Sequence, residues 1–345
     1  MRAKLILENG VEFEGNAFGY PVNTEGEIVF STCMTGYQET LTDPSYAGQI
    51  VVMTYPLIGN YGANLEDMEF ASPKLRALIV HKKCDAPNNW RCEMDIGGFL
   101  KLHNIPGLEG IDTRKLTKII RNEGAMKARL IINAKKEVPD LTGTDGQLVR
   151  YVTCKGVYSV DAPNPVYRIA VMDFGVKNSI LTGLTGMGCS LAVFPAFTSE
   201  REIFSFNPDA VFLSNGPGNP ADMPEVIENI KRLCEIKPIF GVGLGHQLIG
   251  LANRCYIKKL KFGHHGANHP VKDLQTGRIH ITSQNHNYVI ESLDKTIEVT
   301  HTNLNDGSIE GIRHKSKPVM GVQFDPDATP GLSDIKALFS DFLGQ

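Results

Sequence analysis

The sequence predicts an α/β protein of two domains, an α+β amino-terminal domain followed by a domain built on a mainly parallel sheet. Strand-like and helix-like segments alternate regularly from residue 168 onward, as in parallel sheets covered by helices. Before residue 150 the pattern is irregular, and a length of 345 residues is more than one core usually organises. Two separately packed domains are therefore expected.

The first half of the chain mixes short strands with turns. Strand-like runs such as Glu27–Ser31 and Ile50–Thr54 are separated by glycine and proline, and the pattern of Thr113–Asn122 favours a helix. An α+β domain is expected over residues 1–150. Residues 151–167 are predicted to be a linker, because their second half contains two prolines and few apolar clusters.

The second domain is expected over residues 168–345, with strands and helices in regular alternation. The predicted elements are Arg168–Met172 (strand), Asn178–Gly186 (helix), Ser190–Phe194 (strand), Ala210–Leu213 (strand), Met223–Leu233 (helix) and Ile239–Val242 (strand). Ligands of such sheets gather at the carboxyl ends of the strands. Functional residues are therefore expected directly after strands.

Composition and charge argue against several classes of protein. The chain is 42% hydrophobic and 21% charged, which suits a globular protein, and its formal net charge of -3 provides no field that attracts nucleic acid or an anionic membrane. Seven cysteines without a CxxC pair argue against a disulfide framework and against a zinc site. The amino terminus lacks the apolar core of a signal peptide and no apolar run is long enough to span a bilayer, so a cytoplasmic location is expected.

A glycine-rich strand-to-helix turn stands out at Pro238–Ala252. The pattern predicts a buried strand that runs through glycines into a helix, which is the context of a nucleophile elbow. In an elbow the central residue is held in a strained conformation, and the N–H groups that follow it can point at an oxyanion. The central residue here is Gly243. Taken alone, the pattern favours a turn that merely allows close packing or cradles a phosphate.

The sequence Gly-Val-Gly-Leu-Gly-His-Gln around Gly243 resembles the Gly-Ile-Cys-Leu-Gly-His-Gln elbow of class I glutamine amidotransferases, with the cysteine replaced. Three further segments resemble motifs of that family in the same order: Leu213–Pro220, Thr282–His286 and Val322–Asp327. Four segments of the first half resemble the small subunits of carbamoyl-phosphate synthases: Met34–Glu39, Asp43–Tyr46, Tyr55–Tyr61 and Gly110–Arg114. The resemblance extends from Leu5 to about Phe342.

The resemblance implies that the catalytic triad is degenerate. In the family a cysteine thiolate attacks the glutamine amide, a histidine transfers the proton and an acid orients the histidine. The matching positions hold Gly243, Asp325 and Asp327, so glutamine hydrolysis by this chain is predicted to be lost. Cys234 and Cys255 lie outside the turn and are expected to be structural.

No metal is expected at the degenerate site. Asp325 and Asp327 joined by His246, His264 or His286 match no spacing that is typical of metal ligands. His246 and His286 belong to the family pattern beside the triad and are expected to support the turn rather than to replace the lost base.

The resemblance also implies a set of glutamine contacts. These would come from Ser45, Gly216, Gly218, Leu244, Gln247, Asn285, Asn287 and Tyr288. At Asn287 the family usually has glycine, and a side chain at a position where backbone should approach the ligand narrows the pocket. L-Glutamine is therefore the candidate small-molecule ligand, in a pocket that is only partly kept.

As a member of that family the chain is expected to dock on a large subunit, which uses ATP and magnesium to make carbamoyl phosphate. No cofactor is expected in this chain, and the complex would use free ammonia. Whether the chain itself counts as an enzyme stays open, as does the choice between pyrimidine and arginine biosynthesis. Tyr37, Gln38 and Arg114 either face the partner or brace the amino-terminal fold.

Three alternatives to this function remain. The complex could hydrolyse glutamine by an unorthodox route, or the chain could be a pseudoenzyme that senses glutamine without cleaving it. The substitutions could also have been introduced deliberately to inactivate an ordinary glutaminase subunit.

Overall fold

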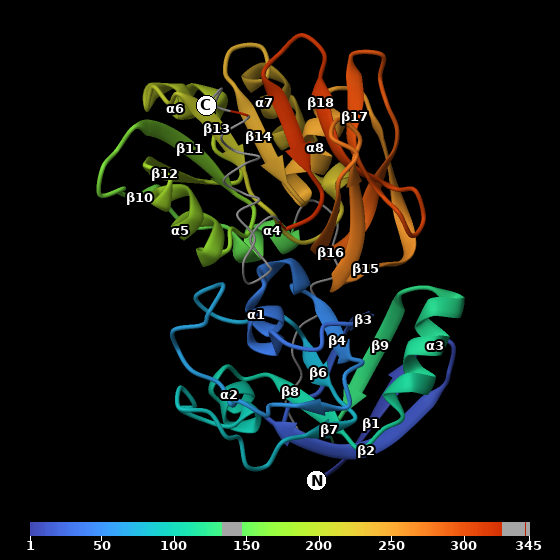
Figure 1. Ribbon diagram of the computed structural model, residues 1–345. Coiled ribbons are helices and arrows are strands. Elements are labelled where there is room, and N and C mark those ends of the chain that lie inside the picture. Colours follow the sequence, from blue (N-terminus) through green and yellow to red (C-terminus); the bar gives the residue numbers. More distant parts are fainter. Residues whose placement is uncertain (133–146, 326–341, 343–345) are drawn as a thin grey trace. The chain divides into compact units, whose positions relative to one another are not determined.

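The structure is a computed structural model that describes residues 1–132, 147–325 and 342. The chain forms two compact units, each described by itself (Figure 1). The amino-terminal unit comprises Met1–Gly143 together with Lys261–Gly266, and the sheet unit comprises Thr144–Leu260 together with Ala267–Gln345. No helix within the described residues is long and apolar enough to cross a membrane.

A closed barrel forms the core of the amino-terminal unit. Its strands follow the order β1-β2-β8-β6-β4-β3-β9 and mix parallel with antiparallel pairs. The elements of the unit are β1 (Arg2–Leu7), β2 (Glu12–Gly19), β3 (Thr24–Ser31), α1 (Tyr37–Thr42), η1 (Pro44–Tyr46), β4 (Gln49–Met53), β5 (Leu57–Ile58), β6 (Ala77–Ile79), β7 (Lys82–Lys83), α2 (Ile96–Leu102), β8 (Pro106–Glu109), α3 (Thr113–Glu123) and β9 (Met126–Ile131). The α+β character expected from the sequence is confirmed.

Helix α3, which the sequence predicted at Thr113–Asn122, is defined by a cap at its start, one buried face and a glycine at its end. The Asp112 side chain accepts a hydrogen bond from the Lys115 N–H, which caps the first turn of the helix. Leu116 and Ile120 lie four residues apart, so they share one face and pack into the barrel core. Gly124, with φ 105°, follows the last turn.

Tyr37 and Gln38 are buried inside the amino-terminal unit. The Tyr37 hydroxyl donates to the carbonyl of Gly62 at 2.5 Å, and the Gln38 amide donates to the carbonyl of Asn64 at 2.6 Å. The possibility that these two side chains face a partner is therefore wrong, because they brace the fold instead. Arg114 is exposed.

The strand β15 (Tyr256–Asp273) corrects the predicted domain boundary. Its residues Lys261–Gly266 belong to the amino-terminal unit, far from the rest of that unit in sequence. The Phe262 ring stacks on Phe30 with centroids 5.8 Å apart, and the Ala125 N–H donates to the carbonyl of Lys261 at 2.8 Å. The prediction that each domain is one continuous segment, residues 1–150 and residues 168–345, is therefore wrong, because Lys261–Gly266 belongs to the first unit.

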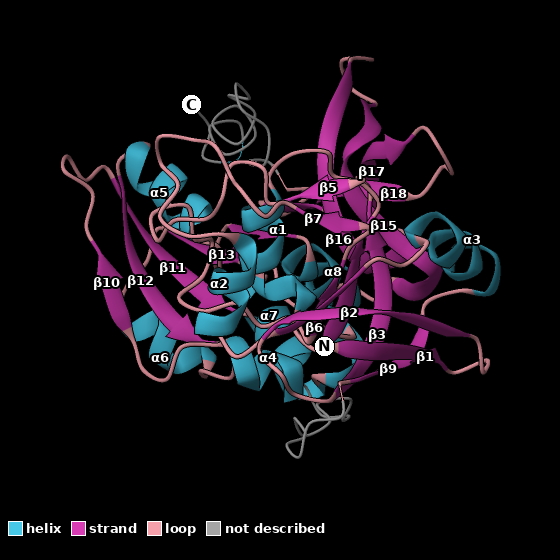
Figure 2. Cartoon of the chain, turned by 90° about the horizontal axis from the view of Figure 1, so that it is seen from below, coloured by secondary structure: helices cyan, strands magenta, loops and turns pink. Residues whose placement is uncertain are grey.

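A ten-stranded sheet organises the second unit, with the order β10-β12-β11-β13-β14-β19-β18-β16-β15-β17. Strands β12, β11, β13, β14 and β19 pair in the parallel sense. The pairs β10–β12, β15–β17, β16–β18, β17–β18 and β18–β19 are antiparallel. Figure 2 shows β10, β12, β11 and β13 side by side in this order. The remaining elements are α4 (Gln147–Val152), β10 (Tyr158–Val160), β11 (Tyr167–Asp173), α5 (Asn178–Gly186), β12 (Cys189–Pro195), α6 (Glu200–Ser205), β13 (Ala210–Leu213), η2 (Pro220–Asp222), α7 (Pro224–Leu233), β14 (Ile239–Val242), α8 (Leu244–Ala252), β16 (Ile279–Ser292), β17 (Ile297–Asn303), β18 (Ile309–His314) and β19 (Val319–Val322).

Both faces of the parallel part of the sheet are covered. Alternate residues of β13 enter different cores: Val211 and Leu213 pack with α7 and α8, whereas Phe212 packs with α5. Strands that are buried on both faces in this way are apolar at successive positions. The carboxyl ends of these strands carry the candidate site.

The predicted linker at residues 151–167 is wrong. Within it, β10 pairs with β12 at the edge of the sheet, and the Cys154 N–H donates to the Asp173 carboxylate at 2.7 Å. A strand of only three residues with an exposed side carries too little apolar pattern to be distinguished from a linker. This segment is a part of the second unit.

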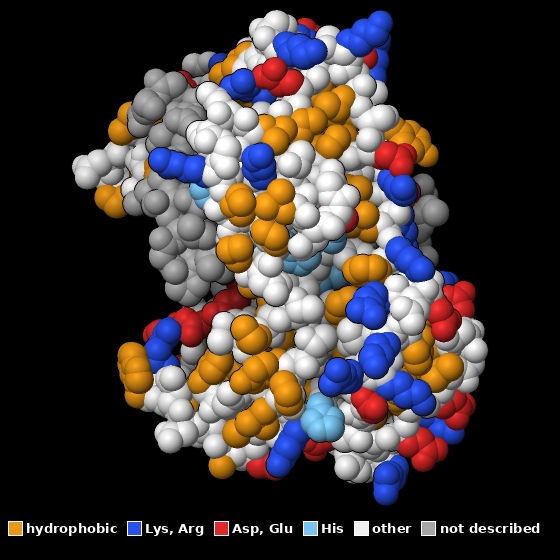
Figure 3. All heavy atoms as spheres, turned by 45° about the vertical axis from the view of Figure 1, so that its right-hand side comes forward, with side chains coloured by type: hydrophobic (Ala, Val, Ile, Leu, Met, Phe, Trp, Pro, Cys, Tyr) orange, Lys and Arg blue, Asp and Glu red, His pale blue; other side chains and the backbone are white. Residues whose placement is uncertain are grey.

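The surface carries charged side chains of both signs, and the face in Figure 3 shows both acidic and basic ones. This agrees with the small formal net charge of -3.

Candidate functional site

Gly243 has the backbone geometry of an elbow. Strand β14 ends at Val242, α8 begins at Leu244, and Gly243 between them has φ 56° and ψ −110°. Its N–H donates to the carbonyl of Val322 at 2.9 Å, which ties the turn to β19. Residues with side chains populate these dihedral angles only under strain. The elbow expected from the sequence is therefore present, and its central residue carries no side chain.

The space around Gly243 would accept a side chain. A Cβ atom at this position would lie 3.5 Å from the Cβ of Asn215 and 3.9 Å from the carbonyl oxygen of Gln323, which are ordinary van der Waals distances. The cost of a side chain is therefore a matter of backbone conformation rather than of crowding.

We expect Gly243→Cys to lower the free energy of unfolding by about 1–3 kcal/mol, because cysteine at this positive φ strains the backbone. Urea unfolding of both proteins would measure the difference. Gly186→Ala is the matched control, since a Cβ at Gly186 meets nothing within 4 Å and the backbone there is helical. Unchanged or increased stability of Gly243→Cys would contradict the strained geometry.

The loop after β13 lies beside the elbow. A Cβ at Gly216 would overlap the carbonyl oxygen of Phe174, so this position requires glycine for packing alone. Gly218 has φ 93°, which also favours glycine. At the start of α8, the Gly245 N–H donates to the carbonyl of Ser214 at 3.0 Å and joins this loop to the elbow. The structure therefore brings Gly216, Gly218 and Leu244 to one edge of the sheet.

Gln247 connects the elbow helix to the candidate glutamine-binding strand. Its side-chain amide donates to the carbonyl of Tyr288 at 2.7 Å and to the Gln323 side chain at 3.0 Å. Asn285, Asn287 and Tyr288 follow on β16 and are half-buried. Strands β16 and β19 and helix α8 thus meet at the site.

Ser45 belongs to the amino-terminal unit. It lies in η1, where its N–H donates to the Asp43 carboxylate at 2.8 Å. The turn begins with Pro44, which holds the backbone in the conformation of the first turn. The remaining predicted contacts all belong to the sheet unit.

Asp325 lies directly after β19 and is paired with a cation. Its carboxylate is 3.1 Å from the ammonium group of Lys177, and the two side chains are only 14% and 5% exposed. The Asp325 N–H donates to the carbonyl of Ser283 at 2.9 Å. Asp327 lies outside the described residues.

Lys177 is a residue of the site that the sequence did not predict. This residue precedes α5 and follows β11, at the carboxyl end of a parallel strand where ligands and functional groups gather. Its position after a strand was the available signal. Its partner, about 150 residues later in the chain, could not be identified by spacing.

His246 cannot replace the missing base. It lies in α8, fully buried, and desolvation lowers the pKa of its imidazole to about 3. A histidine with this pKa stays neutral at physiological pH and is a weak proton acceptor. These properties agree with the expected structural role.

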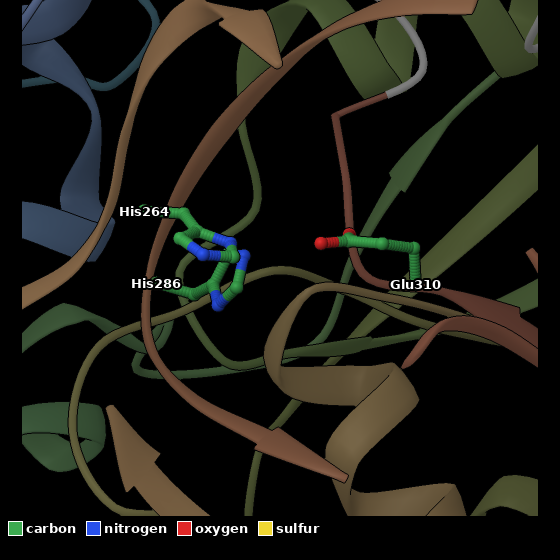
Figure 4. Close-up of side chains that lie close together, drawn as sticks. All are labelled: His264, His286 and Glu310. Atoms are coloured by element: carbon green, nitrogen blue, oxygen red, sulfur yellow. The ribbon is translucent and has the colours of Figure 1, made fainter. Parts of the chain in front are cut away.

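His286 is held by neighbouring groups on its own strand. Its Nδ1 lies 3.0 Å from the carbonyl of Tyr288, and its Nε2 lies 3.2 Å from the Gln284 side chain. Figure 4 shows His286 on β16 and Glu310 on β18, while the third labelled side chain, His264, belongs to the amino-terminal unit. Glu310 accepts a hydrogen bond from Asn303 at 3.0 Å.

The cysteines nearest in sequence do not supply a nucleophile. Cys234 ends α7 and Cys255 follows α8, and both are buried. Burial raises the pKa of the Cys234 thiol to about 11 and raises that of Cys255, so both stay protonated at neutral pH. Within the described residues, no thiol stands at the elbow.

Comparison with known proteins agrees with the geometry. Residues 5–130 match the family model described as carbamoyl-phosphate synthase small chain, CPSase domain, and residues 170–345 match glutamine amidotransferase class-I. A carbamoyl phosphate synthase small chain of Clostridium perfringens is 50% identical over 349 residues, which cover 99% of both chains. The chain of that name from Lactococcus lactis subsp. cremoris is 48% identical, covering 98% of this chain and 96% of its own.

A third relative, the carbamoyl phosphate synthase pyrimidine-specific small chain of Bacillus subtilis, is 47% identical, covering 99% of this chain and 95% of its own. The similarity spans both units and includes the strand-to-helix elbow. This chain therefore belongs to the carbamoyl-phosphate synthase small-chain family.

Proposed function

We propose that this chain is the small subunit of a carbamoyl-phosphate synthase whose own glutaminase activity is lost, so that the complex uses free ammonia. The observation that carries the proposal is Gly243, which leaves the elbow without a nucleophile. Family membership supports the subunit role, since close relatives bear the name of the small chain. The partner is the large subunit, which would bind ATP and magnesium, and this chain needs no cofactor.

The chemistry of amide cleavage explains the predicted loss. Opening the glutamine amide by the covalent route needs a nucleophile and a group that moves a proton. Gly243 has no side chain, Asp325 is paired with Lys177, and His246 is buried and neutral. A well-placed pair of N–H groups can stabilise an oxyanion only after a nucleophile has attacked.

Reconstitution with the cognate large subunit tests the proposal. We expect carbamoyl phosphate to form from ammonium, and glutamine at the same concentration to give no more product than a reaction without a nitrogen source. The large subunit alone with ammonium is the control that shows what this chain adds. Glutamine-dependent synthesis accompanied by stoichiometric release of glutamate would refute the proposal.

A glutamine sensor is the second candidate function. It is favoured by the contacts of Gln247, which hold α8 and β16 together beside the elbow. Calorimetry of this chain with glutamine separates the two functions. Binding without hydrolysis supports sensing, whereas association with the large subunit in the absence of glutamine binding supports the ammonia-dependent complex.

A further inference from the structure

The single tryptophan of this chain lies almost entirely in water. Trp90 belongs to the amino-terminal unit and is 91% exposed, more than any other large hydrophobic side chain in the described part of the chain. Tryptophan is strongly buried on average, because removing its large ring from water is favourable. An indole in this position contributes little to the core of its own unit.

A fixed turn displays this side chain. The Cys92 N–H donates to the carbonyl of Asn89 at 3.1 Å, and the Asn89 side chain accepts from the Arg91 N–H at 2.9 Å. Trp90 and Arg91 are the two central residues of the turn. The backbone that carries the indole is therefore held before any partner binds, so little of its freedom remains to be lost on binding.

A second loop lies beside this turn and exposes Leu65. The Asn88 N–H donates to the carbonyl of Asn60 at 2.9 Å. The Glu93 N–H donates to the carbonyl of Ala63 at 3.0 Å. Leu65 follows Ala63 by two residues and is 55% exposed. Two large apolar side chains are thus presented to solvent from adjacent loops of one unit.

The charges of these two loops are mainly negative. They carry three carboxylates, on Glu66, Asp67 and Glu93, and a single guanidinium, on Arg91. The guanidinium lies 2.7 Å from the Asp67 carboxylate and 3.2 Å from that of Glu66, which ties the loops together. The Glu66 side chain is nevertheless 80% exposed, and Glu93 is exposed as well. Both carboxylates are therefore open to a cationic partner.

We propose that the two loops, Asn60–Asp67 and Asn88–Met94, form a docking face for a protein surface that has an apolar pocket with a basic rim. A side chain at the tip of a turn projects outward, so the complementary pocket belongs to the partner. Trp90 enters this pocket, and Glu66 and Glu93 meet lysine or arginine side chains at its edge. The inference rests on the proposed function, in which the partner that has this surface is the large subunit.

Charge argues against a second copy of this chain as the occupant. A twofold dimer places the same patch of both copies against itself. Glu66 and Glu93 of one copy would then face the same carboxylates of the other, and like charges brought together in an interface cost affinity. A basic partner removes this repulsion and gains attraction instead.

Binding of the cognate large subunit to the full chain tests the docking face. We expect Trp90→Ala to raise the Kd at least about thirtyfold, as for a tryptophan at the centre of an interface, and Trp90→Phe to raise it at most about fivefold. The midpoint of thermal unfolding should not change, because the indole is exposed. Tyr256→Ala is the matched control, since this ring on β15 is 62% exposed and lies outside both loops. It should leave the Kd within about twofold of the parent.

The acidic rim has a separate kinetic test. Glu66→Gln combined with Glu93→Gln removes two exposed charges and keeps the pair of Arg91 with Asp67. We expect association with the large subunit to become about three- to tenfold slower at low ionic strength, because the carboxylates steer a basic partner. At high salt the difference should vanish, since exposed charges are then screened.

The single tryptophan also allows its burial to be observed directly. A chain labelled with fluorotryptophan has one fluorine resonance, and its shift between water and heavy water reports contact of the indole with solvent. We expect this solvent shift in the free chain and expect it to disappear when unlabelled large subunit is added. The label reports on Trp90 alone, whatever tryptophans the partner contains.

The outcomes distinguish the docking face from the subunit role. Unchanged affinity of Trp90→Ala for the large subunit, or a solvent shift that persists in the complex, would overturn the docking face and leave the proposed function intact. A solvent shift that disappears with rising concentration of this chain alone would assign the face to self-association and would also overturn it. If the parent chain does not bind the large subunit, both the docking face and the proposed function fail.

Discussion

Glutamine hydrolysis is expected to appear when Gly243→Cys, Asp325→His and Asp327→Glu are combined. The first change supplies a sulfur nucleophile on a turn that already has elbow dihedrals, and the second supplies an imidazole at the end of β19. The third restores the longer acid of the family. Release of glutamate by the purified variant, coupled to glutamate dehydrogenase, would measure the gain.

Two control variants separate the roles of the restored groups. Gly243→Ala combined with the same two changes has the backbone strain but no sulfur, and it should release no glutamate above the parent chain. Gly243→Cys with Asp327→Glu keeps Asp325, and its rate should be lower by a factor of about 10²–10⁴, the usual contribution of a general acid and base. Equal activity of the alanine and cysteine variants would show that the elbow does not present residue 243 to the substrate.

A loss of about 2 kcal/mol in the free energy of unfolding is expected from His246 alone between pH 7 and pH 5. Burial lowers the pKa of His246 in the folded chain to about 3, whereas an unfolded chain has a histidine pKa near 6.5. Below about pH 6.5 the His246 imidazole binds a proton in the unfolded chain but stays neutral in the folded chain. The stabilisation is therefore complete above pH 6.5 and is lost progressively toward pH 3.

Urea unfolding at several pH values would measure this slope. Burial also lowers the pKa of His301 and His314, so the whole chain should lose more stability than His246 explains. The difference between the parent and His246→Gln isolates the contribution of His246, because the variant has no proton to bind at that position. In the parent, the imidazole resonances of His246 should not titrate between pH 8 and pH 5. A titration midpoint near pH 6.5 would contradict the prediction.

Local patterns in the sequence predicted most of the sheet unit. The apolar run Ile239–Val242 and the glycines that follow predicted β14 and the elbow, and the structure has Gly243 at φ 56°. Such predictions succeed because strand burial and glycine dihedrals depend on residues that are neighbours in the chain. The same reasoning failed at β10, whose three residues are held at the sheet edge by β12 rather than by a pattern of their own.

Local patterns could not predict which distant segments of the chain pack together. Lys261–Gly266 completes the amino-terminal unit although more than a hundred residues separate it from that unit, and Phe262 shows no signal in the sequence for its stacking on Phe30. Lys177 and Asp325 are likewise paired only because β11 and β19 belong to one sheet. A pair of charges has no periodicity, so its partner is decided by topology.

The sequence by itself determined which chemical groups this protein has at the elbow. Residue 243 is a glycine and carries no thiol, and residue 325 is an aspartate and carries no imidazole. Only the tertiary structure decided what the substituted groups do instead. It placed the Asp325 carboxylate against the Lys177 ammonium and withdrew the His246 imidazole from water. The physical reason is that charge and protonation depend on solvent access and on neighbours in space, which the order of residues does not specify.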